Sequence, residues 1–239
     1  RLPADLLSLL PQLPFILLPV ALLIPLFSNH SKELATSLLM LCAYWLIRNH
    51  LQAPLQTVPA AQIFYLLCVV LPINVLALIW LPEHGLRHPQ GIAIALLPAI
   101  GLFLLAQLLV ANPGLMADTS RTNIASAIGS IHLSALSAWL YGLAFACAIF
   151  SAIWQQQMYA SSAVGCALIL AITMGWIDVA NISAIMFTGL GLLLTINITS
   201  GLFHIGFYDE LTQIGNRRAL LAAAKTAGNQ YSLAMIDAD

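Results

Sequence analysis

Long runs of apolar residues, separated by short polar segments, recur along most of this chain. A helix that crosses the hydrocarbon core of a bilayer needs about 20 apolar residues. Runs near that length occupy residues 12–28, 34–47, 63–81, 92–111, 131–154, 160–177 and 182–205. They predict an all-α polytopic membrane bundle of about seven transmembrane helices. Pro14, Pro19 and Pro25 interrupt the first run, so six spans with a re-entrant or interfacial first segment stay open.

The overall composition excludes an ordinary soluble protein. Of the 239 residues, 61% are hydrophobic and 7% are charged, and the mean hydropathy is +0.93. In a soluble domain about a quarter of the residues are charged. The expected partner of most of the protein surface is therefore the lipid bilayer. The formal net charge is −1, and no feature of the composition predicts binding to nucleic acid.

Polar residues return sharply after the last apolar run. This break predicts a membrane domain over residues 1–205 and the beginning of an aqueous domain over residues 206–239. Asn216 is a suitable N-cap for a helix over residues 217–227, and Gly228 with Asn229 is a stop signal. Residues 231–236 then predict a short, buried strand. The second domain is therefore expected to begin as an α/β fold.

Two carboxylates, Asp237 and Asp239, follow the predicted strand directly. In open α/β sheets, ligands bind at the carboxyl ends of the strands, and two carboxylates at this spacing can share a hard cation such as Mg²⁺. Polar residues that end a strand and only face water give the same pattern. The spacing alone leaves both interpretations open.

The residues that begin this domain and those that follow its strand resemble one known family. Together they look like the opening of a GGDEF domain, the catalytic domain of diguanylate cyclases. The family usually has glycine where Gln213 stands, which is a change within a turn. The resemblance rests on Asp209-x-Leu211-Thr212-x-x-x-Asn216-Arg217-Arg218-x-Leu220 and on Met235-Ile236-Asp237-Ala238-Asp239.

The resemblance implies a function for the full-length protein. Diguanylate cyclases condense two GTP into cyclic di-GMP, and two of their domains meet in a homodimer. Asp237 is similar to the family's first metal-binding aspartate, and the Ala238 backbone carbonyl to a further ligand of Mg²⁺ (or Mn²⁺). The fragment alone is expected to be catalytically incomplete, because the family's Gly-Gly-Asp/Glu-Glu-Phe signature is not among these residues. A structural and coupling role is implied for Asp209, Leu211, Thr212, Asn216, Arg217 and Arg218.

GTP is a cytoplasmic substrate, so the resemblance implies a multi-pass protein of a bacterial inner membrane with its C-terminus in the cytoplasm. Two other functions stay open. The first is a degenerate GGDEF protein that acts as a nucleotide receptor or regulates a phosphodiesterase. The second is a non-enzymatic membrane receptor or transporter whose tail only imitates the motif.

Small residues form stripes in two of the apolar runs. Such stripes let helix backbones approach closely, so they predict helix–helix contacts. The contact of the fifth run lies either within one bundle or between two subunits. The last run carries Gly189 and Gly191. The stripe of the fifth run consists of Ser130, Ser134, Ala138, Gly142 and Ala146.

Few polar groups lie within or between the apolar runs, and each is a functional hypothesis by default. His132 and Asn197 lie within runs, and Asp178 lies in the turn before the last run. A single histidine that faces a neighbouring helix is commonly a satisfied structural group. His84 and His88 have the spacing that suits a metal on a helix, but they lie in a loop rich in glycine and proline. No metal site is predicted there.

Overall fold

The computed structural model describes residues 9–52, 54–55, 57–116, 127–128, 131–154, 158–209, 212 and 214–226. By its internal contacts the chain divides into two compact units, Arg1–Ile198 and Thr199–Asp239. The division falls within the last long helix, shortly before the boundary that the composition predicts.

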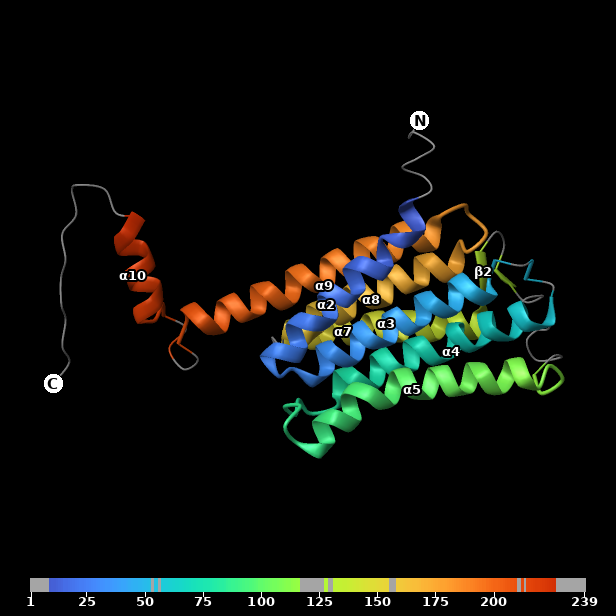
Figure 1. The fold of residues 1–239 in the computed structure, drawn as a ribbon, viewed down its shortest axis with the longest axis horizontal. Coiled ribbons are helices and arrows are strands. Elements are labelled where there is room, and N and C mark those ends of the chain that lie inside the picture. The colour runs from blue at the N-terminus through green and yellow to red at the C-terminus, as the bar shows by residue number, and fades with distance from the viewer. Residues whose placement is uncertain are drawn as a thin grey trace. The chain divides into compact units, whose positions relative to one another are not determined.

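Helices make up most of the described residues in both units. Figure 1 shows the long helices of the first unit side by side, as an up-and-down bundle, which confirms the predicted all-α architecture. The chain order is η1 (Leu10–Gln12), α2 (Pro14–Ser28), α3 (Ser31–His50), α4 (Val58–Trp80), α5 (Pro89–Ala111), β1 (Ala127–Ile128), β2 (Ile131–Ser134), α7 (Ala135–Trp154), α8 (Met158–Gly175), α9 (Ile182–Phe207) and α10 (Arg217–Thr226).

Five helical segments of the described residues are long and apolar enough to cross a membrane. The 23 residues of α4 span about 35 Å, against about 30 Å of hydrocarbon. The second and sixth predicted runs form α3 and α8. The apolar part of α8 is shorter, Tyr159–Gly175, and α3 carries Lys32, Glu33 and Arg48. The five segments are Leu10–Ser28, Val58–Trp80, Pro89–Ala111, Ala135–Trp154 and Ile182–Phe207.

Helix α3 lies at the centre of the first unit. It packs against α2, α4, α5 and α8, and 13 of its 20 residues are buried. Because protein surrounds it, its polar groups find protein partners: the Ser37 hydroxyl donates to the Ala21 carbonyl at 3.3 Å. The predicted run 34–47 was therefore too short. The helix begins three residues earlier, at Ser31, and includes the charged residues that flank the apolar run.

The fifth predicted run, 131–154, is helical only from Ala135. Its first four residues form β2, which pairs antiparallel with β1. Ser134 ends this strand, and its Oγ accepts a hydrogen bond from the Ser137 N–H at 3.3 Å. A serine that takes up a free N–H at a helix start favours helix initiation there. The hairpin and this cap explain why the helix begins late.

The residues of the small-residue stripe in the fifth run differ in burial. Ser134 lies in β2 and is buried, Ala138 is half-buried, and Gly142 and Ala146 are exposed. A contact of the stripe, within one bundle or between two subunits, stays a prediction. The buried residues of α7 are Ser137, Tyr141, Ala144, Ala148 and Ser151.

Close contacts between backbones hold α9 in the first unit. A Cβ added at Gly191 would lie 2.9 Å from the Leu17 Cβ of α2, and one added at Gly165 of α8 would lie 2.7 Å from the Leu193 side chain. Only glycine permits such an approach without displacing the neighbour. A Cβ at Gly189 would meet open space. Of the two glycines in the last apolar run, Gly191 is therefore the one that packs.

Candidate functional site

A compact turn in the second unit contains the opening of the GGDEF-like motif. Tyr208 and Gly215 form an antiparallel bridge, and the Asp209 N–H donates to the Ile214 carbonyl at 2.9 Å. Inside the turn, the Asp209 Oδ1 accepts hydrogen bonds from the Thr212 N–H and from the Thr212 hydroxyl, both at 3.0 Å. Aspartate is favoured in turns for this reason, since its carboxylate takes up nearby N–H groups. Asp209 and Thr212 thus stabilise the turn directly.

Asn216 connects this turn to the helices on both sides. Its Oδ1 accepts from the Arg218 N–H at 2.9 Å and from the Ala219 N–H at 3.2 Å, which makes it the N-cap of α10. Its Nδ2 donates to the Gly206 carbonyl in the last turn of α9 at 2.9 Å. Its N–H donates to the Phe207 carbonyl at 2.8 Å. The predicted cap is confirmed, and the predicted helix 217–227 is present over its described residues, Arg217–Thr226.

The remaining motif residues are less informative. Arg217 and Arg218 are exposed on the first turn of α10. Leu211, Asp237 and Ala238 lie outside the described residues, as do the expected strand 231–236 and Ser130. The structure therefore brings together Asp209, Thr212 and Asn216, and it leaves the expected metal ligands as a prediction.

Replacing Asn216 with alanine is expected to destabilise α10 by about 1 kcal/mol, the usual cost of removing an N-cap side chain. The helix has only 10 residues, and isolated helices of that length are marginal in water. Amide hydrogen exchange of residues 217–226 should therefore become about fivefold faster. The matched variant Asn216→Asp keeps the acceptor and should retain the protection of α10. Equal exchange rates in the alanine and aspartate variants would contradict the cap.

A second cluster of polar groups lies at one end of the bundle, in the first unit. Glu83, in the loop after α4, accepts hydrogen bonds at its Oε1 from the Ser31 N–H at 2.6 Å and the Ser31 hydroxyl at 2.9 Å. Its Oε2 accepts from the Lys32 N–H at 3.4 Å. A carboxylate is favoured at a helix N-terminus, where free N–H groups and the helix dipole attract negative charge. Glu83 thus caps α3 from a distant part of the chain.

Glu33 lies in the first turn of α3 and is 7% exposed. Its Oε2 is fully buried and makes no hydrogen bond to any described residue. A small cavity borders this side chain, with a volume of about 10 Å³, about the space for one water molecule. Its lining consists of His30, Glu33, Ser162, Asn197 and Ile198.

Lys32 supplies the positive charge of this cluster. It is 2% exposed, and its Nζ lies 5.5 Å from the centre of the Tyr159 ring, a cation–π distance. Lys32 and Glu33 both precede the apolar run of α3. One lysine therefore faces two carboxylates at the end of a largely apolar bundle.

Sequence reasoning missed this cluster. It treated Lys32 and Glu33 only as flanks of an apolar run and considered His84 and His88 as the metal candidates. The structure stacks the His84 and His88 rings with their centres 5.6 Å apart. Within the described residues, His30, Glu33 and Glu83 instead have ligand atoms within 4.8 Å of one another. The available signal was a pair of charged residues beside a histidine, next to an otherwise apolar helix.

His132 and Asp178, two further polar residues of the sequence analysis, lie near the hairpin and the α8–α9 turn. His132 lies in β2 rather than within a membrane helix, and its Nε2 is 2.5 Å from the Asp178 carboxylate in the turn after α8. The side chains are 30% and 62% exposed. This pair joins the hairpin to the α8–α9 turn and has a structural role.

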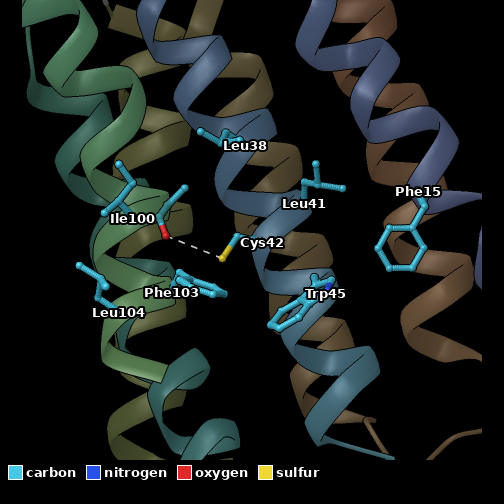
Figure 2. Close-up of a pocket in the computed structure, with 9 residues that line it drawn as sticks. Phe15, Leu38, Leu41, Cys42, Trp45, Ile100, Phe103 and Leu104 are labelled. Carbon is cyan, nitrogen blue, oxygen red and sulfur yellow. Dashed lines mark hydrogen bonds between the residues drawn. The ribbon is translucent and has the colours of Figure 1, made fainter. Parts of the chain in front are cut away.

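An apolar groove of about 460 Å³ lies between α3 and α5, with Phe15 of α2 at its side. Figure 2 shows Cys42 and Trp45 of α3 facing Ile100, Phe103 and Leu104 of α5. The Cys42 Sγ lies 3.7 Å from the Ala99 carbonyl, to which it donates. The lining is otherwise almost entirely apolar, so it suits hydrocarbon.

In comparisons with known proteins, no family model matches the chain, and neither the curated proteins nor the solved structures give a significant match.

Proposed function

We propose that the chain is the membrane-bound sensor and anchor region of a diguanylate cyclase, with the beginning of its cytoplasmic GGDEF domain. The observation that carries this proposal is the turn that directly follows α9. Its hydrogen bonds use Asp209, Thr212 and Asn216, which are three of the residues on which the family resemblance rests. The motif residues thus stabilise the turn at the place where the resemblance expects the domain to begin, which supports the proposal.

The structure of this turn suggests how a signal reaches the domain. Helix α9 runs without proline from Ile182 to Phe207. The carbonyls of Gly206 and Phe207 at its end both accept hydrogen bonds from Asn216, and Asn216 also caps α10. A shift or rotation of the end of α9 is therefore passed to α10 through one residue, without a flexible linker or a coiled coil.

The proposed membrane arrangement has seven spans, with α3 and α8 added to the five apolar segments. Successive long helices of the first unit run in opposite directions (Figure 1), as consecutive spans of a membrane bundle do. Trp80 and Trp154 are the exposed last residues of α4 and α7, as expected for an aromatic belt at a membrane interface. The C-terminal side is cytoplasmic in this proposal, since GTP is found there, and the membrane is a bacterial inner membrane.

The proposed substrate is GTP, and the proposed active form is a homodimer. Asp237 and the Ala238 carbonyl are the proposed ligands of Mg²⁺ or Mn²⁺. Such an ion stabilises the negative charge that develops on a transferring phosphoryl group. Asp237 and Ala238 are assigned to this role by their resemblance to the family's metal-binding residues.

The test is incubation of the full-length protein, in membranes, with GTP and Mg²⁺, followed by mass spectrometry of the nucleotides. Cyclic di-GMP is the expected product, and membranes without the protein and reactions with ATP are the controls. Binding of GTP or cyclic di-GMP without synthesis would favour the degenerate receptor or phosphodiesterase regulator. Neither synthesis nor binding would contradict the proposal and favour a membrane receptor or transporter.

A further inference from the structure

We propose that His30, Glu33 and Glu83 form a binding site for a first-row divalent transition-metal cation, of which Zn²⁺ is the test case. This site is separate from the cyclase motif, and all of its residues lie in the first unit. The inference does not depend on the proposed function.

Three separate segments bring the ligands together. His30 lies in the turn between α2 and α3, Glu33 lies in the first turn of α3, and Glu83 lies in the loop between α4 and α5. Their ligand atoms lie within 4.8 Å of one another. Bound metals hold such ligands at about 2.0–2.2 Å from the ion, so a modest contraction of this group is needed. Two of the ligands come from connecting segments, which can make that movement.

The buried Oε2 atom of Glu33 is an independent indication of a ligand. It has no hydrogen-bond partner among the described residues, and Glu33 borders the small cavity that Ser162 and Asn197 also line. Leaving a buried carboxylate oxygen without a partner is costly. A cation placed beside it would remove that cost. Asn197, which the sequence marks as a polar group within an apolar run, then offers a further oxygen.

Charge and ligand type favour a transition-metal cation over other occupants. Glu33 and Glu83 bring two carboxylates, and Lys32 is the one lysine beside them. The cluster therefore attracts positive charge and repels anions. Imidazole is a ligand for Zn²⁺, Fe²⁺ or Ni²⁺ rather than for Mg²⁺ or Ca²⁺. The hydrogen bonds that hold Glu83 at the start of α3 also fix its orientation, as partners of metal-ligating carboxylates commonly do.

The graded exposure of the three ligands gives the ion a path inward. Glu83 is exposed, His30 is half-buried and Glu33 is buried. An ion can thus exchange water for protein ligands one at a time. The innermost ligand is next to Asn197 of α9, the helix that continues to the motif turn.

The experiment measures Zn²⁺ binding to the purified 239-residue chain in detergent, without a histidine tag, by equilibrium dialysis and metal analysis. We expect about one Zn²⁺ per chain, with Mg²⁺ and Ca²⁺ competing poorly. Glu33→Gln and His30→Gln should each weaken binding by more than about a hundredfold, because loss of a group outside the ligand shell already costs about 10- to 100-fold. Helical circular dichroism and elution as a single species check that each variant is folded.

Matched controls separate this site from other ligands in the chain. His204→Gln and Asp178→Asn make the same chemical changes elsewhere and should bind as the wild type does. The proposal is overturned if binding does not saturate, if it survives in folded Glu33→Gln, or if His204→Gln or Asp178→Asn removes it. None of these measurements uses GTP, so their outcome is independent of cyclase activity.

Discussion

Full-length protein in which alanine replaces Asp237 is expected to insert into the membrane normally and to make no detectable cyclic di-GMP. The resemblance gives this carboxylate the role of a metal ligand. Without it, the ion that stabilises charge on the reacting phosphate is bound poorly. Loss of one group that stabilises developing charge commonly lowers the rate of an enzyme by about a hundredfold or more. The measurement is cyclic di-GMP formed per mole of protein from GTP and Mg²⁺.

The matched control for this variant is Asp178→Ala. It removes a carboxylate of the same kind from the exposed turn after α8, where Asp178 pairs with His132. Synthesis should continue in that variant. If Asp237→Ala keeps the activity of the wild type, Asp237 is not a ligand of the catalytic metal ion. The family resemblance would still hold. Inactivity of all three proteins would instead argue against the cyclase itself.

Local signals in the sequence predicted the local structure well. Long apolar runs became helices, because a backbone in lipid satisfies its own hydrogen bonds most simply as a helix. Asn216 predicted the start of α10 within one residue, since capping needs only a side-chain oxygen two or three residues before free N–H groups.

Features that depend on distant residues were not predictable in the same way. The buried cluster joins Ser31 and Glu33 to Glu83, which lies after most of α3 and all of α4. No spacing rule connects residues so far apart. The small-residue stripe of α7 was a local pattern, but which face of a helix is buried depends on neighbours that the pattern does not contain. The hydropathy of the sequence predicts a helix that is too short at α3. Because protein surrounds α3, charged residues can extend the helix beyond its apolar run.

Replacing Gly191 with alanine is expected to destabilise the bundle by about 1–3 kcal/mol, the usual cost of overpacking a close contact. The added Cβ would lie 2.9 Å from the Leu17 Cβ, 3.3 Å from the Leu17 carbonyl carbon and 3.4 Å from the Leu18 nitrogen. These atoms belong to the backbone of α2 or are attached to it, so rotation of a side chain does not relieve the clash. Helix α2 must move away from α9, which opens the contact around it.

Two other glycines make this prediction a graded series, measured by thermal unfolding in one detergent. Gly165→Ala meets the Leu193 methyl groups, which can rotate away, so its loss should be smaller. Gly189→Ala meets no atom within 4 Å and should be neutral or stabilising by up to about 1 kcal/mol, because alanine favours helix more than glycine does. The order of stability should be Gly189→Ala, then Gly165→Ala, then Gly191→Ala. If Gly191→Ala is as stable as Gly189→Ala, α2 and α9 do not pack through Gly191. Movement of the bundle would then reach α9, and through it the motif turn, by a different contact of α9.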